Sequence, residues 1–340
     1  MNKILNLFDT KYVTELFKKE ALGYFPEFCG VKNVNIIVHK QHVWEETYHI
    51  VLEFRTEFEK NNRETETFSI FCSAHSDEPR KNVYDSLKFL WDNGFSGKYL
   101  TIPQALFYSE YFRAVFYYGV DGQNLYQYIR VGDTKEIEKI IPRAAKWFAT
   151  LHNMNAKKAK NFNEQNSRIE TVVPGTEHIL ESIGKWYPEY KERFRALYKI
   201  FIDKENEFLN STDKRWLVHG DAHPENVIKI SDKSIAVIDF TDLCLADFAR
   251  DLGTFIQQAE FMIMRKMHDQ KYADKIKNMF LAHYFKSSKE KYNASVEARM
   301  KNYFAWTAIR TATFYMMKHN PEPERGYPLI EKVEKEFLGL

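Results

Sequence analysis

The stretch LVHGDAHPENVIKISDKSIAVIDF, residues 217–240, constrains this chain more than any other part of it. A polar run of His, Asp, His and Asn leads into two short apolar segments, VIKI and IAVI, which are joined by SDKS. Two apolar segments around a four-residue polar turn predict a β-hairpin. We therefore expect a polar loop that runs directly into a pair of strands.

The hairpin predicts a metal site at its open end. If Ile230 pairs with Ile235, antiparallel partners have numbers that sum to 465, and Asn226 then faces Asp239. Directly opposite residues have Cβ atoms roughly 5 Å apart. A carboxylate and an amide oxygen at that separation suit Mg²⁺, which prefers oxygen ligands and takes few of them from protein. Asn226 and Asp239 are the predicted metal ligands.

Asp221 lies on the loop before the hairpin, directly after Gly220. A carboxylate beside a metal–phosphate site can orient an attacking hydroxyl and accept its proton. Glycine permits a tight loop conformation. Each of these residues alone is an ordinary turn residue, but their combination with an Asp across the hairpin indicates a site. Asp221 is the predicted catalytic base.

The rest of the chain predicts an α+β fold with two lobes, because 340 residues exceed one small domain. Between residues 34 and 120, VNIIVHK, TYHIVLEFR, ETFSIFCSA, TIPQALFYS and FRAVFYYGV read as strands, with a helix over 81–94. After residue 122 the apolar period is helical apart from the hairpin. We predict an N-terminal antiparallel-sheet lobe, residues 1–119, and a larger, mostly helical lobe, residues 120–340. Near the N-terminus we expect an amphipathic helix whose apolar positions are Leu5, Phe8, Val13, Leu16 and Phe17.

Composition excludes several classes of protein. The net charge is only +2, without long basic runs, so no nucleic-acid partner is predicted. No apolar run reaches the roughly 18 residues of a membrane span, and the N-terminus lacks the apolar core of a signal peptide. Three isolated cysteines, Cys29, Cys72 and Cys244, are expected to be buried thiols in a reducing compartment. These features predict a cytoplasmic protein that does not bind membranes.

The loop and hairpin together resemble a known family. HGDAHPEN followed by VIDF is similar to the catalytic loop and metal-binding strand of the aminoglycoside phosphotransferase and choline kinase family. TDLCLADFARDLGTF, LHNM at 151–154 and YYGVDGQNLYQYI extend the likeness over roughly residues 100–255. Members of this family are small-molecule kinases with a bilobal, protein-kinase-like fold. The resemblance implies Mg²⁺ as cofactor and ATP as phosphate donor, with GTP as the alternative.

The resemblance also implies roles for single residues. Asp221 matches the base, and Asn226 and Asp239 match the metal ligands. His223 stands where protein kinases carry a lysine that points at the transferred phosphate, with a structural role as the alternative. The remaining matches are structural or backbone roles: His219 under the loop, Asp251 at a helix start where it binds the loop backbone, and Tyr118 and Val120 as backbone contacts for adenine.

The first lobe departs from the family pattern. A kinase of this type covers the phosphates with a flexible loop and supplies a strand lysine paired with a helix glutamate. Here the first turn, HKQHVWEE, has no glycine. Phe71 or Cys72 stands at the lysine position, and Val83 or Asp85 stands near the glutamate position. The candidates for the missing positive charge are Lys40, Arg55, Arg80, Lys81 and Lys88.

Three functions remain open from the sequence. The first is transfer of a γ-phosphoryl group to a hydroxyl of a small molecule. The second is a non-catalytic, pseudokinase-like nucleotide-binding or interaction protein, because the first lobe lacks the usual cation. The third is a metal hydrolase that uses His219, Asp221 and His223.

The acceptor is constrained only by the C-terminal part of the chain. From Phe255 to Leu340 it holds 15 Lys and Arg against 10 Asp and Glu, which argues against a polycationic acceptor. An aromatic cage for a choline-like cation is one alternative, and a sugar or another small hydroxylated metabolite is the other. The residues that could build this cage are Tyr303, Phe304, Trp306, Phe314 and Tyr315.

Overall fold

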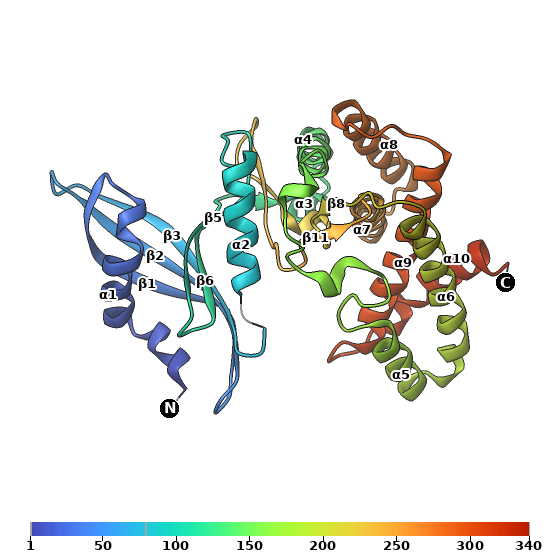
Figure 1. The fold of residues 1–340 in the computed structure, drawn as a ribbon, viewed down its shortest axis with the longest axis horizontal. Coiled ribbons are helices and arrows are strands. Elements are labelled where there is room, and N and C mark those ends of the chain that lie inside the picture. The colour runs from blue at the N-terminus through green and yellow to red at the C-terminus, as the bar shows by residue number, and fades with distance from the viewer. Residues whose placement is uncertain (1, 79, 340) are drawn as a thin grey trace. The chain divides into compact units, whose positions relative to one another are not determined.

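The computed structural model describes residues 2–78 and 80–339. The backbone divides into two compact units, Met1–Asp121 with Ala236–Thr241 and Gly122–Ile235 with Asp242–Leu340 (Figure 1). The sequence predicted one boundary after residue 119, so it did not anticipate that Ala236–Thr241 groups with the first unit. Within the described residues, no helix combines the length and apolar character that crossing a membrane requires.

The first unit is built on a five-stranded antiparallel sheet in the order β1-β2-β3-β6-β5. The strands of this unit are β1 (Phe28–Val43), β2 (Tyr48–Lys60), β3 (Thr65–His75), β4 (Leu100–Thr101), β5 (Gln104–Ser109) and β6 (Ala114–Tyr118). Its helices are α1 (Thr10–Glu20) and α2 (Lys81–Leu90). The five predicted strands are confirmed, with β4 as a short addition.

One face of this sheet forms the core of the first unit. On β3, Ile70 and Cys72 are fully buried in the same apolar cluster as Val13 and Phe17 of α1. Because side chains alternate along a strand, Phe71 lies on the opposite face. The sheet therefore has one face covered by α1 and a second face that carries Phe71 and its cross-strand neighbours.

Two predictions about the first unit are wrong. The N-terminal helix begins at Thr10, where the Asp9 side chain accepts a hydrogen bond from Lys11 N at 2.9 Å, so Leu5 and Phe8 belong to a preceding 3₁₀ turn. An N-cap carboxylate fixes a helix start in this way. Cys29 is exposed rather than buried, whereas Cys72 and Cys244 are buried as predicted.

The turn between β1 and β2 is short. The strands extend to Val43 and Tyr48, so most of the predicted turn HKQHVWEE is paired strand. The four connecting residues close with a hydrogen bond from Trp44 N to Thr47 O at 2.9 Å, and they include Glu45 and Glu46. This tight acidic turn differs from the flexible glycine loop that covers phosphates in kinases.

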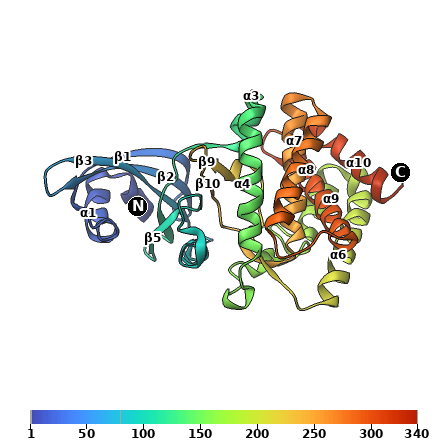
Figure 2. The same ribbon diagram turned by 90° about the horizontal axis from the view of Figure 1, so that it is seen from above.

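The second unit is mostly helical. Its helices are α3 (Leu125–Val131), α4 (Thr134–His152), α5 (Thr176–Trp186), α6 (Lys191–Ser211), α7 (Ala249–Met267), α8 (Gln270–Ser287), α9 (Ala294–Met317) and α10 (Tyr327–Phe337). Its short strands are β7 (Gln123–Asn124), β8 (Trp216–Val218), β9 (Val227–Lys229) and β11 (Cys244–Ala246), and β10 (Ile235–Val237) spans the boundary between the units. Helix α7 packs against both α8 and α9 (Figure 2).

The second unit begins at a glycine that no other residue can replace without a shift. Gly122 precedes β7, which pairs antiparallel with β9. A Cβ atom at Gly122 would lie 2.2 Å from Lys229 O. The close approach of two backbones therefore requires glycine here.

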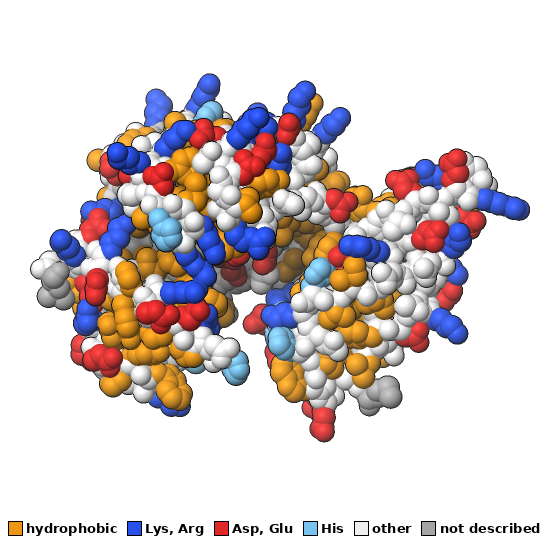
Figure 3. Space-filling view, turned by 180° about the vertical axis from the view of Figure 1, so that it is seen from behind, with side chains coloured by type: hydrophobic (Ala, Val, Ile, Leu, Met, Phe, Trp, Pro, Cys, Tyr) orange, Lys and Arg blue, Asp and Glu red, His pale blue; other side chains and the backbone are white. Residues whose placement is uncertain are grey.

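In a space-filling view, Lys and Arg side chains are spread over the second unit among acidic and apolar side chains (Figure 3).

Candidate active site

A two-stranded sheet positions the polar loop. β8 pairs antiparallel with β11, with Val218 opposite Cys244, and both residues are fully buried. The next residue, His219, is fully buried as well. Its Nδ1 atom lies 3.3 Å from Asp221 N and accepts a hydrogen bond from it. The predicted position of His219 beneath the loop is therefore confirmed, and a side chain held in this way is not placed to bind the metal of a hydrolase.

Gly220 adopts a left-handed conformation with φ of 85°. A Cβ atom at this position would lie 2.3 Å from Asp242 O. Both the positive φ and the close backbone exclude other residue types. The glycine in the HGD sequence is thus a geometric requirement of the turn that presents Asp221.

The buried carboxylate of Asp251 holds the loop backbone. It accepts hydrogen bonds from His219 N at 2.7 Å and from Gly220 N at 2.9 Å. His152 Nε2 lies 3.0 Å from the same carboxylate, and His152 Nδ1 lies 2.8 Å from the Tyr284 hydroxyl. Burial raises the pKa of Asp251, but the hydrogen bond and charge of His152 outweigh this and leave the pKa below its ordinary value. The predicted contact between Asp251 and the loop is confirmed.

The helix start was predicted three residues too late, because the predicted N-cap is Asp251 and the observed N-cap is Phe248. α7 begins at Ala249, whose N–H is bound by the Asp247 carboxylate at 3.1 Å, so Asp251 lies inside the first turn. The next residue, Arg250, is 1% exposed, and its Nη2 atom donates to Gly220 O at 3.0 Å. The first turn of α7 therefore holds the loop through one carboxylate and one guanidinium group.

Asp221 and His223 lie together at the tip of the loop. His223 Nδ1 accepts a hydrogen bond from Glu225 N at 3.3 Å, so in the neutral ring the proton is on Nε2, which lies 3.3 Å from Asp221 Oδ2. Burial raises the pKa of Asp221, but the hydrogen bond and charge of His223, with the charge of Arg310, hold it well below its ordinary value. Asp221 is therefore ionised at neutral pH, the state that a base requires.

Asn226 is tied to the same loop and is 6% exposed. Its Nδ2 atom donates to Asp221 O at 3.0 Å, which leaves its Oδ1 atom directed away from this contact. No described residue donates a hydrogen bond to Asn226 Oδ1. The amide thus offers an oxygen ligand next to Asp221, as the sequence predicted.

Asp239 belongs to the first unit, whereas Asp221, His223 and Asn226 belong to the second. Asp239 has a positive φ of 65°, which is uncommon for a residue other than glycine, and its Oδ1 atom accepts from the Thr241 hydroxyl at 2.9 Å. Backbone strain of this kind occurs at functional sites. The proximity of Asp239 and Asn226 stays a prediction.

The predicted hairpin register is wrong at the turn. Ile230 N donates to Ser234 O at 3.1 Å, and Ser231 N donates to the same oxygen at 3.2 Å. Two consecutive N–H groups that share one carbonyl form a β-bulge, which adds one residue to its strand. Ile230 therefore pairs with Ser234 instead of Ile235. The residue numbers of paired residues therefore do not sum to 465 along this hairpin, so its register does not support a contact between Asn226 and Asp239. The family resemblance alone supports that contact.

A pocket of about 550 Å³ in the second unit adjoins the loop. Asp221 and His223 line it on one side, and α7 and α9 line it with Arg265, Arg310 and Tyr315 among others. This volume is within the range of small-molecule sites. The pocket is the candidate acceptor site.

The predicted aromatic cage does not form as a unit. Tyr303 and Trp306 are 1% exposed and lie in the core, whereas Phe314 and Tyr315 line the pocket. Protein cations already lie over the Tyr315 ring, with Arg265 Cζ at 5.7 Å and Lys318 Nζ at 5.2 Å from its centroid. The aromatic side chains are therefore not arranged to surround a choline-like cation.

In the first unit, the strand lysine and helix glutamate are replaced by other groups. Phe71 lies on the sheet face opposite α1, stacked on Tyr117 with centroids 5.8 Å apart. On the same face the buried Glu53 carboxylate binds Arg55 Nε at 3.0 Å and His39 Nε2 at 2.9 Å. The buried carboxylate on this sheet face is therefore carried by strand β2 and not by helix α2.

Among the predicted cations, only Lys40 has no hydrogen-bond or ion-pair partner in the described part of the chain. Arg80 pairs with Glu78, and Lys81 and Lys88 pair with acids one turn along α2. Lys40 is half-buried and pairs across the strands with Val51, which shares a face with Glu53. Lys40 therefore lies on the face opposite α1 with its charge available.

Tyr118 and Val120 lie at the end of β6. Tyr118 pairs with Ile70 on one side and with Gln104 on the other, so its backbone belongs to the sheet. Val120 follows the end of the strand and has no hydrogen bond to any described residue. Their predicted role in binding adenine stays a prediction, and Val120 has the more available backbone.

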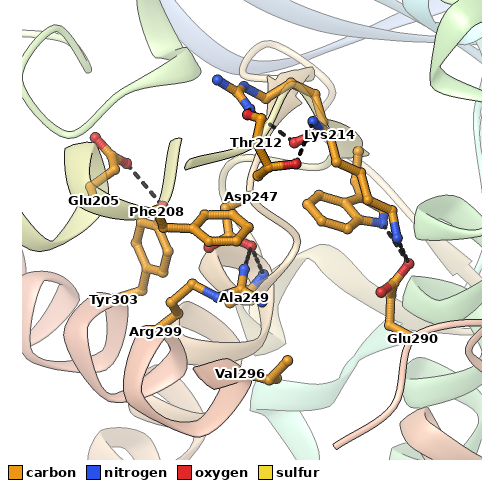
Figure 4. Close-up of polar contacts among 12 residues, drawn as sticks. Glu205, Phe208, Thr212, Lys214, Asp247, Ala249, Glu290, Val296, Arg299 and Tyr303 are labelled. Carbon is orange, nitrogen blue, oxygen red and sulfur yellow. Dashed lines mark hydrogen bonds and ion pairs between the residues drawn. The ribbon is translucent and has the colours of Figure 1, made fainter. Parts of the chain in front are cut away.

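Buried polar contacts also connect α6 and α9 near the start of α7 (Figure 4). Tyr303 Oη donates to Glu205 Oε1 at 3.0 Å, and Ile169 N donates to Glu205 Oε2 at 2.8 Å. Arg299 pairs with Asp247, and its guanidinium lies 3.7 Å from the Phe208 ring centroid. Burial raises the pKa of Glu205 to about 7. These contacts fix the helices on which the loop rests.

The oxygen donors are suited to Mg²⁺. The amide oxygen of Asn226 and the carboxylate of Asp239, the two predicted ligands, are hard donors of the kind that Mg²⁺ takes. No group of three or more His, Cys, Asp or Glu side chains within residues 2–78 and 80–339 is arranged to hold a metal. Mg²⁺ commonly takes few ligands from protein and completes its coordination with phosphate and water, so the predicted site does not require such a group.

Sequence reasoning missed two residues near the loop, His152 and Arg310, and one in the first unit, Glu53. His152 was quoted within LHNM, but its contact with Asp251 joins residues 99 positions apart, and no local pattern predicts that. Glu53 was missed because alternating strand patterns do not distinguish a buried acid from a surface acid. Arg310 was missed because it lies within an apolar helix whose period predicts only core.

Comparison with known proteins identifies a family model and several solved structures that are similar to this chain. A model of the phosphotransferase enzyme family matches residues 61–284. No curated protein matches the sequence significantly. Among solved structures, a spectinomycin phosphotransferase in complex with ADP and spectinomycin is 15% identical, with a TM-score of 0.54 over 97% of this chain and 94% of that one.

Two further structures are similar. The choline kinase LicA from Streptococcus pneumoniae is 14% identical, with a TM-score of 0.55 over 97% of this chain and 100% of that one. An ethanolamine kinase of Plasmodium vivax is 12% identical, with a TM-score of 0.55 over 88% and 81%. The predicted kinase-like fold, with its antiparallel sheet and helical part, is thereby confirmed.

Proposed function

The chain belongs to the phosphotransferase enzyme family, and we propose that it transfers the γ-phosphoryl group of a nucleoside triphosphate to a hydroxyl of a small molecule. The observation that carries the proposal is the position of Asp221, at the tip of a loop whose backbone is bound by Asp251 and Arg250, in the lining of a pocket. The relatives of similar fold include one in complex with ADP and others named choline and ethanolamine kinases.

In the proposed reaction Asp221 orients the acceptor hydroxyl and receives its proton. The acceptor oxygen forms a bond to the γ-phosphorus while the bond from that phosphorus to the leaving diphosphate breaks. His223 donates to Asp221 and keeps its carboxylate in one orientation. Asn226 and Asp239 would hold Mg²⁺, which neutralises phosphate charge when bound.

Lys40 is the proposed donor-side cation. It has the available charge that Arg55 lacks, because Glu53 already pairs with Arg55. Positive charge near the transferred phosphoryl stabilises the charge of the transition state. Val120 is the proposed backbone contact for adenine, with Tyr118 beside it. ATP is the proposed donor, and GTP is the alternative.

The second candidate function is a non-catalytic nucleotide-binding protein. The observation that favours it is the tight acidic turn between β1 and β2, which includes Glu45 and Glu46 and lacks glycine. Carboxylates at this turn would repel phosphate instead of binding it. This candidate predicts nucleotide binding that does not depend on Mg²⁺.

Calorimetric titration with ATP, with and without Mg²⁺, separates the two candidates. We expect binding that strengthens with Mg²⁺ in the wild-type protein and loses this dependence in Asp239→Ala. The matched control is Asp232→Ala, which removes an exposed carboxylate from the turn of the same hairpin. Binding that is equal with and without Mg²⁺ in all three proteins would contradict the proposed metal site and favour the second candidate.

A further inference from the structure

Arg310 is a half-buried cation with an unusual set of neighbours. It lies on α9 and lines the pocket that contains Asp221. Its guanidinium lies 4.9 Å from the Trp306 ring centroid. It makes no hydrogen bond or ion pair with any residue that the structure describes. A guanidinium group carries five N–H donors, so several donors of Arg310 are available to a ligand in the pocket.

Other polar side chains on this wall of the pocket bind one another. Gln258 Nε2 donates to Thr311 Oγ1 at 2.7 Å and to Gln257 Oε1 at 2.9 Å. Thr307 Oγ1 donates to Tyr303 O at 2.8 Å, and Thr311 Oγ1 donates to Thr307 O at 2.9 Å. Their donors are already used. Arg310 thus keeps its N–H donors for a ligand, whereas these amide and hydroxyl donors are used.

Arg265, the second cation that lines the pocket, already donates one hydrogen bond. Arg265 Nη1 donates to Tyr315 Oη at 2.7 Å, and its charge also acts on Glu322. The acids that line the pocket are Asp221 and Glu225, and Asp221 is already occupied by His223. Neither the carboxylates nor the covered Tyr315 ring provides the acidic or aromatic environment that a cationic acceptor needs.

We propose that the acceptor is a hydroxylated anion, and that Arg310 binds its carboxylate or phosphate group while Asp221 orients the hydroxyl that is phosphorylated. This inference rests on the proposed function and specifies its substrate class. The charge of Arg310 is placed to attract an anion beside Asp221, and planar guanidinium donors match the oxygens of carboxylate and phosphate. Burial lowers the pKa of Arg310, and the charge of Asp221 opposes this shift.

The test compares matched acceptors with the purified full chain. Gluconate is paired with glucitol, and glucose 6-phosphate is paired with glucose, so that each pair differs by one anionic group. Ligand-induced shifts in melting temperature are measured without nucleotide, and phosphoryl transfer is measured with ATP and Mg²⁺. We expect one or both anions to bind and to be phosphorylated at least about 10-fold better than the neutral partner.

Arg310→Gln should weaken anion binding about 10- to 100-fold, whereas Arg310→Lys, which keeps the charge, should retain part of it. Arg195→Gln is the control because this arginine lies on the exposed side of α6 and pairs only with Glu192. The melting temperature without ligand reports whether each variant folds. The anion preference should disappear in Arg310→Gln and persist in Arg195→Gln.

Three results would overturn the proposal. Equal or better binding of the neutral partners, or of choline, would show that the pocket does not select anions. A loss of ATP affinity in Arg310→Gln with unchanged acceptor binding would assign the arginine to the donor phosphate. Anion binding that does not change in Arg310→Gln would place the anion elsewhere. Absence of ATP turnover together with anion binding that depends on Arg310 would instead contradict the proposed function and leave only the anion site at Arg310 standing.

Discussion

The two units hold their charged side chains in different ways. In the second unit, Asp251 and Arg250 are 1% exposed and bind the backbone of the loop that carries Asp221. In the first unit, Arg55 and Lys40 lie on a sheet face, and Arg55 remains 57% exposed. Buried ionic contacts fix a backbone because breaking them leaves an uncompensated charge, whereas exposed pairs contribute little. The loop that carries Asp221, the proposed base, is therefore held rigidly, whereas Lys40, the proposed donor-side cation, lies on a face whose side chains are free to adjust.

The largest expected effect tests the second unit directly. Asp221→Asn removes the proton acceptor and keeps the size of the side chain, so we expect kcat to fall by about 10²–10⁴. Asp203→Asn, an exposed carboxylate paired with Lys199 on α6, is the control. The rate of phosphoryl transfer from ATP measures the effect. Equal rates in both variants would remove the base from the proposed mechanism.

Asp251→Ala should be the most destabilising change at the loop. It leaves His219 N and Gly220 N without an acceptor and His152 without its partner, at an expected cost of about 3–5 kcal/mol in the free energy of unfolding. Asp269→Ala, which removes only the N-cap of α8, should cost about 1 kcal/mol. Urea unfolding measures both variants. Similar losses would mean that the loop is not held by Asp251.

Glu205 tests how burial in the second unit affects stability with pH. Its pKa is raised to about 7 from 4.5, so the folded protein binds a proton more tightly than the unfolded chain. The contribution of Glu205 to the free energy of unfolding is therefore largest below about pH 4.5. It falls by about 3 kcal/mol as the pH rises to about 7, and it does not change above that pH.

The variant Glu205→Gln should remove this dependence. Its unfolding free energy relative to wild type should rise by about 3 kcal/mol between pH 5 and pH 8. The exposed neighbour Glu207→Gln is the control and should show no such change. A constant difference for Glu205→Gln across this range would contradict the raised pKa.

The smallest expected effect concerns ATP affinity and the two cations of the first unit. Lys40→Gln removes the available cation, and we expect ATP affinity to fall about 10- to 100-fold. Arg55→Gln removes a cation on the same face that Glu53 already pairs, so ATP affinity should change little. Calorimetric titration measures both variants. The reverse order of effects would assign the donor-side role to Arg55.

Local sequence patterns predicted much of the fold. The five strands of the first unit follow from β-branched and aromatic runs, and the confirmed kinase-like fold follows from the HGDAHPEN and VIDF segments. The hairpin register was wrong because a bulge at Ile230 and Ser231 depends on hydrogen bonds to Ser234 that no alternation predicts. The N-cap of α7 was misplaced because Asp251 fits the N-cap rule in sequence, whereas the helix begins after Phe248 and the Asp251 carboxylate binds the backbone of a distant loop instead.

The sequence by itself determined the loop, the glycine at position 220, the family and the residue types at the proposed base and metal positions. These features depend on short-range backbone geometry and on the chemistry of neighbouring residues. Only the tertiary structure decided that His152 and Asp251 meet across 99 positions, that Glu205 is buried, and that Arg310 lies in the pocket with Asp221. Those contacts depend on how helices pack, and packing sets the burial and charge around each group. The residues of the loop could thus be recognised along the chain, whereas the candidate acceptor pocket is formed by the assembled helices.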